Sequence, residues 1–347
     1  MINFGKGIPR VLVFLCILTI SLIVAGCGNQ GEQAANENAK EKEKPTLVFA
    51  DPGWDSIRFH NDVAGFIIEN GYGYKTDVIP GSTPATFTGF RNGDIDIYME
   101  LWKQNIIDIY NDAIEKGEII EVSVNFDDNA QGLYVPTFVI KGDPARGIEP
   151  MAPDLKSVKD LPKYWELFKD PEDPSKGRIY GAIPGWKVDE ILYTKYQNYG
   201  LDKTFNYFRP GSDTALAAGI AKAVEEGKPW VGYYWEPTWI TGKYDLTLLE
   251  DEEYSDEKWN NGYACEWPSN DVTVAVHSSM PEKAPEVVEF LKHYQTSSQL
   301  TSEALAYMQD NEVDTKEAAK WFLKQHEDLW TAWVPEEIAQ KVKAALE

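Results

Sequence analysis

The sequence predicts an α/β protein with parallel, doubly wound sheets. Two observations support this prediction: from Leu47 onward short β-rich runs alternate with helical stretches, and apolar residues recur on one face of the helical stretches. The length of 347 residues is enough for two domains, and 43% hydrophobic beside 26% charged residues excludes a disordered chain. The sequence shows no internal repeat.

The first part of the chain contains strands and helices in turn. The predicted elements are strand Leu47–Asp51, helix Ser56–Asn70, strand Tyr74–Ile79, helix Pro84–Arg91, strand Asp94–Glu100 and helix Asn105–Lys116. Gly71 is expected to end the first helix, because glycine readily takes the left-handed conformation found at helix C-termini. In the third helix, Ile106, Ile109, Tyr110 and Ala113 share one face.

The same alternation returns later in the chain. The predicted elements are strand Ile179–Ile183, helix Asp189–Tyr199, a helix capped by Ser212 or Asp213 that ends at Glu226, and strand Trp230–Trp235. The proline- and charge-rich segment Gly142–Lys176 is expected to form loops on a second lobe. The C-terminal third is expected to be helical, with core-facing side chains at Val287, Val288, Leu291, Tyr294, Trp321, Phe322, Leu329, Trp330 and Trp333.

The N-terminal residues are typical of an export signal. Lys6 and Arg10 precede the apolar run Val11–Val24, which is shorter than the roughly 20 residues of a membrane-spanning helix. The run ends in Val24-Ala25-Gly26-Cys27, which resembles the lipobox of bacterial lipoproteins. We therefore expect residues 1–27 to be a lipoprotein signal peptide with Cys27 as the lipidated residue; a plain secretory signal with a chance cysteine is the alternative.

Residues 28–45 are rich in Gln, Asn, Glu, Lys and Ala and have no apolar period, so they are expected to form a disordered tether. Fully extended, this tether would reach at most about 60 Å. The folded part is therefore expected on the extracytoplasmic face of the cell membrane, held there by the lipid. After loss of the signal and lipidation of Cys27, Cys265 is the one cysteine left, and it is expected to be a small buried residue.

The charge balance excludes several classes of protein. Lys and Arg total 33 against 56 Asp and Glu, a net charge of -23, so a nucleic-acid partner is not expected. The four histidines His60, His277, His293 and His326 are scattered without metal-ligand spacing. The sequence contains no nucleophile elbow, phosphate-binding loop or dinucleotide fingerprint. We therefore expect no cofactor, no metal and no enzymatic activity.

Four tryptophans follow or end predicted strands. They are Trp54, Trp102, Trp186 and Trp235. In open α/β sheets, ligands bind beyond the carboxyl ends of the strands. Core packing would explain any one of these residues, but four at the same topological position indicate a ligand site.

A cage of indole rings suits a quaternary ammonium group. Such a group has no N–H to donate, and its charge is spread over methyl groups that pack on aromatic faces by cation–π attraction. Each face contributes on the order of 1–2 kcal/mol. Three faces together with an anchor for a carboxylate could reach the roughly 8 kcal/mol of micromolar binding.

The sequence also contains a possible anchor for an anion. Pro184-Gly185 precedes Trp186, and a helix is predicted just after it. The N–H groups of Lys187 and Val188 at this helix N-terminus would point toward a carboxylate beside Trp186. The Lys187 side chain could add a charge, although an exposed lysine is the simpler interpretation.

Five short motifs resemble those of glycine betaine/proline betaine-binding proteins of ABC importers. They are Glu100-Leu101-Trp102 after Gly93-Asp94-Ile95-Asp96, Asn129–Gly132, Ile183–Trp186, Tyr233–Trp239 and Trp330–Val334. The resemblance extends from about Leu47 to the C-terminus. It implies a two-lobed, type II periplasmic-binding-protein-like fold with two hinge crossings, near Gly132–Pro136 and Leu249–Tyr254. Lobe 1 would then comprise residues 46–134 and 250–347, and lobe 2 residues 135–249.

The resemblance also implies a function and a set of site residues. Trp102 of lobe 1 and Trp186 and Trp235 of lobe 2 would form a three-walled box for the ammonium head, and backbone amides just after Trp186 would hold the carboxylate. The protein would be a monomer that delivers a quaternary amine to the permease and ATPase of an ABC transporter.

Departures from the family pattern leave the ligand open. One branch of the family has a histidine four residues after the first box tryptophan, whereas this chain has Ile106, beside Asn105, which could take its place. Trp54 could supply a fourth wall. A negative charge lining the box would favour a plain cation such as choline over a zwitterion; solvated or helix-capping roles are the alternative for the candidate acids Glu100, Glu236, Glu266 and Asp271.

Three other functions fit parts of the sequence. A choline- or carnitine-binding importer component, or one for another small solute such as a sugar, would use the same architecture. A secreted glycoside hydrolase would need two paired carboxylates, which are easily found by coincidence in so acidic a chain.

Overall fold

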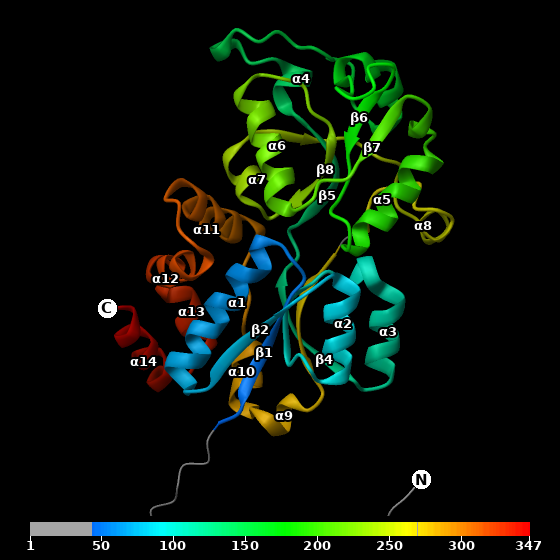
Figure 1. The fold of residues 1–347 in the computed structure, drawn as a ribbon. Helices are drawn as coiled ribbons and strands as arrows, with labels where there is room; N and C mark the ends of the chain where they lie inside the picture. The colour runs from blue at the N-terminus through cyan, green and yellow to red at the C-terminus, as the bar shows by residue number, and fades with distance from the viewer. Residues whose placement is uncertain (1–43, 269) are drawn as a thin grey trace, which may run out of the picture. The chain divides into compact units, whose positions relative to one another are not determined.

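The computed structural model describes residues 44–268 and 270–347 (Figure 1). The predicted signal peptide, the lipidation site Cys27 and most of the predicted tether therefore lie outside the described residues. Among the described residues, no helix is both long and apolar enough to span a membrane.

The first sheet contains strands from both ends of the described chain. Its strands are β1 (Thr46–Asp51), β2 (Lys75–Pro80), β3 (Ile97–Leu101), β4 (Ile119–Phe126) and β10 (Val272–His277), in the order β2-β1-β3-β10-β4. β1 runs parallel to β2 and β3, whereas β10 is antiparallel to both β3 and β4. The prediction of a parallel sheet is therefore correct for the first three strands and wrong for β10.

The second sheet is mixed in the same way. Its strands are β5 (Ala130–Pro136), β6 (Gly177–Tyr180), β7 (Phe205–Phe208), β8 (Gly232–Glu236) and β9 (Leu246–Leu248), in the order β7-β6-β8-β5-β9. β6 is parallel to β7 and β8, whereas β5 is antiparallel to β8 and β9. In both sheets the antiparallel strand is the one that enters from the other half of the fold, so its direction is not set by a local strand–helix–strand unit.

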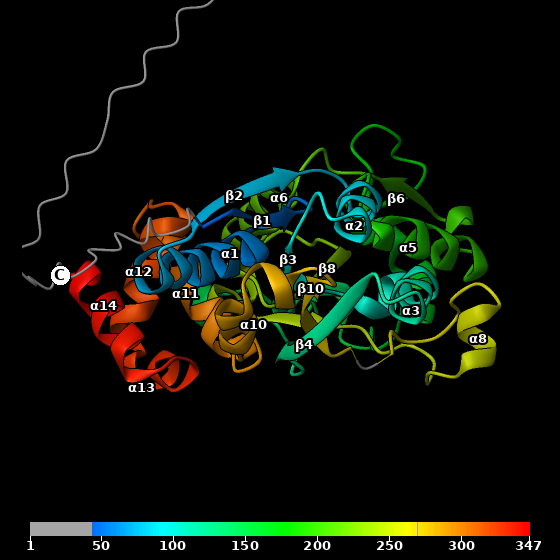
Figure 2. The same ribbon diagram turned by 90° about the horizontal axis from the view of Figure 1, so that it is seen from below.

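Helices cover both faces of the first sheet (Figures 1 and 2). They are α1 (Asp55–Ile67) with the π-helical turn η1 (Ile68–Tyr72), α2 (Thr83–Asn92), the 3₁₀ turn η2 (Lys103–Ile106), α3 (Ile107–Glu115), α9 (Met280–Lys283), α10 (Pro285–Leu291), α11 (Ser298–Asp310), α12 (Thr315–Gln325), α13 (Glu327–Trp330), η6 (Thr331–Trp333) and α14 (Glu336–Leu346). The predicted helix Asn105–Lys116 is thus a 3₁₀ turn followed by α3.

Gly71 does not end the first helix as expected. The helical conformation continues to Tyr72, and Gly73, with φ 74°, is the left-handed C-cap. A Cβ atom on Gly71 would lie 2.6 Å from Cγ2 of Ile338 in α14. Gly71 is therefore required by the close approach of α14 and not by a turn.

The second sheet has its own set of helices. They are α4 (Thr137–Lys141), η3 (Pro144–Arg146), η4 (Val158–Phe168), α5 (Lys187–Asn198), η5 (Leu201–Lys203), α6 (Asp213–Glu225), α7 (Trp239–Lys243) and α8 (Asp256–Asn260). The segment predicted as loops, Gly142–Lys176, contains the 3₁₀ helices η3 and η4. Ser212 caps α6 by accepting a hydrogen bond from the amide of Ala215, as one of the two predicted caps.

The chain passes between the sheets at residues 127–129 and in the segment 249–271. The first predicted crossing, Gly132–Pro136, lies inside β5 instead, because these residues pair with β8 and β9. Leu249–Tyr254 lies at the start of the second crossing. The backbone amides of Leu249 and Glu250 still donate hydrogen bonds to the carbonyls of Leu133 and Lys156 in the second half. The division into 46–134 with 250–347 and 135–249 as moving bodies stays a prediction.

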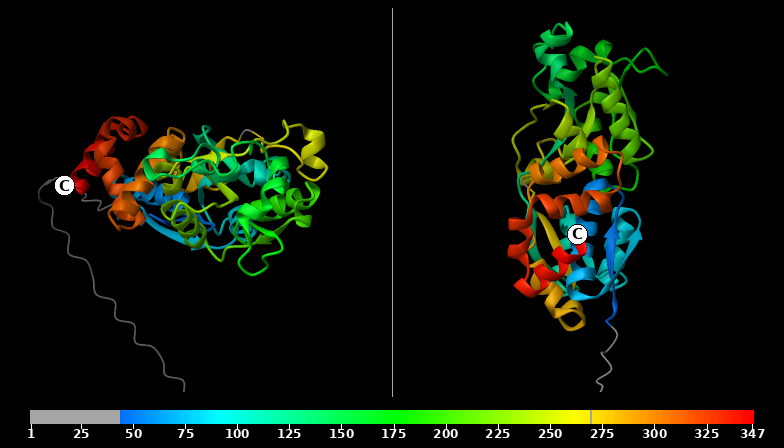
Figure 3. Two further views of the ribbon diagram at one scale, coloured as in Figure 1. Left: turned by 90° about the horizontal axis from the view of Figure 1, so that it is seen from above. Right: turned by 90° about the vertical axis from the view of Figure 1, so that its left-hand side faces the viewer.

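The C-terminal helices pack on the first half of the fold (Figure 3). α12 contacts α1, and Phe322, Trp330 and Trp333 are buried in the same core as β1 and α1. Trp321 is half-buried and stacks on Tyr307 at 4.3 Å between ring centroids. The prediction that these side chains face the core is confirmed for Phe322, Trp330 and Trp333 and holds in part for the half-buried Trp321. Cys265 is fully buried in a small cluster with Ile191 and Trp259, as predicted.

A buried histidine makes the stability depend on pH. His60 is fully buried, its Nδ1 lies 2.9 Å from the hydroxyl of Tyr294, and burial lowers the pKa of His60 to about 3. Between pH 6.5 and 3 the unfolded chain binds a proton at His60 that the folded chain does not, so the contribution of His60 to stability falls as the pH falls. Between pH 7 and 5 this linkage should remove about 2 kcal/mol.

Urea unfolding at pH 7 and pH 5 measures this effect. The change in the free energy of unfolding from pH 7 to pH 5 should be about 2 kcal/mol more favourable in His60→Gln than in wild type. His293→Gln, a change at an exposed histidine, is the matched control and should keep the wild-type pH dependence. Equal pH dependence in wild type and His60→Gln would contradict the prediction.

Candidate ligand-binding site

A cavity of about 40 Å³ lies between the two sheets. Its walls come from the ends of strands and the beginnings of helices in both halves of the fold. The lining residues are Trp54, Thr83, Tyr98, Leu101, Trp102, Asn105, Ile106, Trp186, Lys187, Val188, Tyr233 and Trp235. All seven ligand-binding residues predicted from the sequence are in this set: Trp54, Trp102, Asn105, Trp186, Lys187, Val188 and Trp235.

The strand ends bring the four tryptophans together. Trp54 follows β1, Trp102 follows β3, Trp186 follows the loop after β6, and Trp235 lies near the end of β8. Each is buried, with 4–9% of its surface exposed. Three of them occupy helix N-cap positions, of α1, η2 and α5, where an indole makes no side-chain capping bond. Serine, threonine or aspartate would stabilise these helix ends better, so local helix stability is reduced where the cavity is built.

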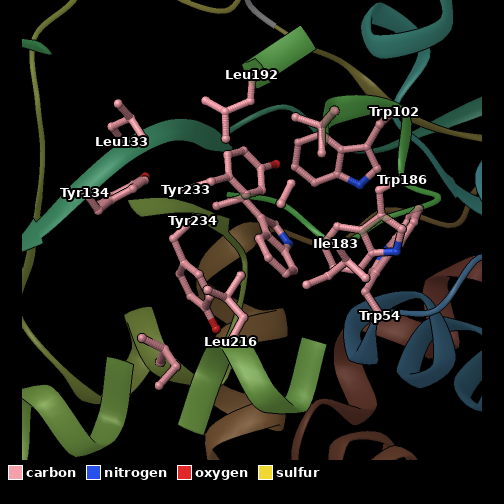
Figure 4. Close-up of a cluster of buried hydrophobic side chains, with 14 of the residues drawn as sticks. Trp54, Trp102, Leu133, Tyr134, Ile183, Trp186, Leu192, Leu216, Tyr233 and Tyr234 are labelled. Atoms are coloured by element: carbon pink, nitrogen blue, oxygen red, sulfur yellow. The ribbon is translucent and has the colours of Figure 1, made fainter. Parts of the chain in front are cut away.

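The rings meet edge to face around the cavity (Figure 4). The centroid of Trp186 lies 5.4 Å from that of Trp54 and 5.1 Å from that of Trp235, with interplanar angles of 84° and 86°. Tyr233 stacks on Trp235 at 5.9 Å. Tyr233 was missed in the sequence, although the alternation of side chains along a strand places it on the same face as Trp235.

Hydrogen bonds join the two halves of the fold at the rim of the cavity. Trp186 Nε1 donates to the carbonyl of Pro52 at 3.1 Å, and the amide of Thr83 donates to the carbonyl of Gly185 at 3.1 Å. The amide of Asp55, the first residue of α1, donates to Oδ2 of Asp213 at 3.4 Å. A carboxylate of the second half thus caps a helix of the first half, and burial together with Asp55 raises the pKa of Asp213 to about 7.

Glu100 lies directly behind two of the tryptophans. Its Oε1 accepts hydrogen bonds from Nε1 of Trp54 and Nε1 of Trp102, both at 2.8 Å, and from the hydroxyl of Ser56 at 3.0 Å. The side chain is fully buried, and burial raises the pKa of Glu100 to about 7 although the three hydrogen bonds lower it. The carboxyl group therefore fixes the orientation of two indole rings.

Comparison with known proteins identifies the family. Residues 45–325 match the family model OpuAC, the substrate binding domain of ABC-type glycine betaine transport systems. The chain belongs to the OpuAC family. As an OpuAC domain it is a substrate-binding component of a transport system and not an enzyme, so the glycoside hydrolase interpretation is excluded.

Several named proteins are similar in sequence to this OpuAC domain over different parts of its length. It is 23% identical over 302 residues to the trimethylamine N-oxide-binding protein of Pelagibacter ubique, covering 86% of this chain and 93% of the relative. It is 24% identical over 200 residues to the glycine betaine/proline betaine-binding periplasmic protein of Escherichia coli K12, covering 54% of this chain and 60% of the relative.

Solved structures confirm the two-lobed fold of the OpuAC protein. A choline-binding protein of an ABC transporter in complex with choline matches with a TM-score of 0.69 and 23% identity, over 87% of this chain and 98% of that chain. Lactococcal OpuAC, closed and complexed with glycine betaine, matches with a TM-score of 0.66 and 18% identity, over 84% and 100%. The two-lobed, type II α/β architecture predicted from the family resemblance is therefore correct.

Some polar groups of the OpuAC site already have a partner within the protein, and others do not. α5 begins at Lys187, so the amides of Lys187 and Val188 have no acceptor within the helix. The ammonium group of Lys187 pairs with Glu190, one turn along α5. Oδ1 of Asn105 is buried and has no hydrogen-bond partner among the described residues.

Of the four candidate acids in the OpuAC domain, Glu100 is the one that contacts the tryptophans. Glu236 accepts from the hydroxyl of Tyr134 at 3.4 Å, Glu266 accepts from the amide of Tyr254 at 3.3 Å, and Asp271 lies 3.6 Å from Nζ of Lys103. None of the four acids is among the residues that line the cavity. Within the described ranges, no group of His, Cys, Asp and Glu could hold a metal ion.

Proposed function

We propose that this protein captures a small quaternary ammonium compound in the cavity between its lobes and delivers it to the permease of an ABC transporter. The observation that carries the proposal is the convergence of Trp54, Trp102, Trp186 and Trp235, from four separate chain segments, on one buried cavity. A hydrophobic core has no need of four indoles at strand ends, whereas a methylated onium group is bound well by their faces.

The energetics of the cavity support micromolar binding. Three desolvated aromatic faces at about 1–2 kcal/mol each contribute about 3–6 kcal/mol, and charge-assisted hydrogen bonds to an anion add about 1.5–3 kcal/mol each. The sum reaches the roughly 8 kcal/mol that corresponds to a Kd of 1 μM. We propose that the amides of Lys187 and Val188, at the positive end of α5, hold the anionic end of the ligand.

Glycine betaine or a related betaine is the ligand class we propose, because the cavity combines aromatic faces with unbonded amides. Asn105 is the proposed substitute for the histidine that one branch of the family has at the position of Ile106. Choline is the second candidate, and Glu100 favours it, since a carboxyl group behind the cage attracts a net cation. The names of the relatives, which bind betaines, choline and trimethylamine N-oxide, support the shared chemistry of a methylated nitrogen that has four substituents and no N–H.

Titration of the purified full-length chain tests the function. Isothermal calorimetry and tryptophan fluorescence with glycine betaine, proline betaine, carnitine and choline should detect at least one ligand with a Kd in the micromolar range. Maltose is the control and should give neither heat nor a change in fluorescence. Binding of maltose, or binding of none of the four onium compounds, would contradict the proposal.

We also propose that the protein acts as a lipid-anchored monomer outside the cytoplasm. The lipobox-like sequence ending at Cys27 and the polar residues 28–45 support a lipid anchor with a tether. The OpuAC family supports the extracytoplasmic location and the partnership with an ABC permease and its ATPase.

A further inference from the structure

Glu100 differs from the other buried acids of the described residues in its partners. The other four are neutralised by cations: Asp51 by Arg58, Asp96 by Lys283, Asp170 by Arg178 and Asp189 by Arg209. The three donors to Glu100 are two indole N–H groups and a hydroxyl, which carry no net charge. A buried carboxylate without a cation is costly, and such groups normally take up a proton instead.

The second oxygen of Glu100 strengthens this contrast. Oε2 is buried and has no hydrogen-bond partner among the described residues. Burial and the three hydrogen bonds are the causes that shift the pKa of Glu100, and no cation contributes to that shift. The charge of Glu100 in turn raises the pKa of Tyr98, Asp213 and Tyr294, none of which is a cation. The carboxyl group is therefore poised between its protonated and ionised forms near neutral pH.

We propose that the cation which Glu100 lacks is the onium group of the ligand. The ionised carboxylate acts on this group through the N–H groups of Trp54 and Trp102, because an indole that donates to an anion has a more negative ring face. Binding of the cation therefore favours the ionised form. The protonated carboxyl group releases its proton to solvent, and the onium ion becomes the counter-charge of the carboxylate.

The inference rests on the proposed function and makes Glu100 a specificity-determining residue of the same site. A ligand with a quaternary nitrogen is favoured over a neutral ligand of the same shape, since the neutral ligand gains nothing from the carboxylate. It also makes affinity for a cation rise with pH through the range in which Glu100 ionises. A merely structural Glu100 would produce neither effect.

Calorimetry at pH 7 in phosphate and in Tris, two buffers with different heats of ionisation, measures the proton release directly. Wild type should release about half a proton on binding choline, and its Kd should fall about tenfold or more between pH 5.5 and pH 8.5. Glu100→Gln should release no proton and show a Kd independent of pH over this range. The neutral isostere 3,3-dimethylbutan-1-ol should bind wild type without proton release.

Asp213→Asn is the matched control, because Asp213 also has a pKa of about 7 and lies at the rim of the cavity. This variant should keep the proton release of wild type. Loss of the release in Asp213→Asn but not in Glu100→Gln would overturn the proposal and assign the proton to the rim. The wild-type measurement decides the matter even if Glu100→Gln does not fold.

The outcomes separate this inference from the proposed function. If choline or glycine betaine binds wild type without proton release and without pH dependence, the inference fails and the function stands. If no onium compound binds at any pH, the function fails and the inference fails with it.

Discussion

Replacing Trp186 by alanine is expected to weaken binding of the onium ligand about 30- to 150-fold. Trp186 lies between Trp54 and Trp235 and contacts both rings, and its Nε1 bonds to the carbonyl of Pro52 in the other lobe. The variant loses one cation–π face, worth about 1–2 kcal/mol, and a hydrogen bond across the lobes, worth about 1 kcal/mol. The sum of about 2–3 kcal/mol gives the expected loss of affinity.

Calorimetry with the best ligand measures this loss, and two variants serve as controls. Trp186→Phe keeps an aromatic face but loses the N–H donor, so it should lose about fivefold to tenfold. Trp321→Ala makes the same change at a tryptophan that stacks on Tyr307 away from the cavity, and it should bind like wild type. The cage assignment would be wrong if Trp186→Ala bound the ligand with wild-type affinity.

The cage could be predicted because it depends on a simple topological property. The carboxyl ends of parallel strands meet at one edge of a sheet, so tryptophans at the ends of predicted strands of one sheet are expected to be neighbours. This places Trp54 with Trp102 at the first sheet and Trp186 with Trp235 at the second. That the two pairs face one another was implied by the resemblance to two-lobed binding proteins. Trp54, Trp102, Trp186 and Trp235 met this condition in the sequence, and all four line the cavity. The same local reasoning could not place β10, because its partners β3 and β4 lie far away in the chain, as in the pairs Thr273 with Leu101 and Val272 with Phe126.

The role of Glu100 shows where sequence reasoning stops. Glu100 was one of four candidate acids, and nothing in residue spacing separates it from Glu236. Only the folded geometry shows two indole N–H groups and the hydroxyl of Ser56 meeting at one carboxylate oxygen. The sequence also gives no sign that Asp213 caps α1, because Asp213 and Asp55, the first residue of α1, belong to different lobes.

Lys195→Ala is expected to destabilise the protein by about 3–5 kcal/mol. Nζ of Lys195 lies 2.6 Å from Oδ2 of Asp251; the side chain of Lys195 is buried and that of Asp251 nearly so, with 3% and 9% exposed. The same ammonium group donates to the carbonyl of Cys265 and lies 4.2 Å from the ring centroid of Trp267. The variant leaves a buried carboxylate without its counter-charge, which costs far more than the net worth of the ion pair.

Urea unfolding of a double-mutant cycle separates these two quantities. Asp251→Leu alone leaves the ammonium group buried and unpaired, so it too should cost about 3 kcal/mol or more. Lys195→Met with Asp251→Leu removes both charges and fills the space with apolar atoms, so it should cost much less than either single change.

Because this ion pair joins the segment 249–271 to α5, whose first residues line the cavity, the single variants should also weaken ligand binding. Additive losses in the double variant would contradict the coupling and show that the two side chains act independently.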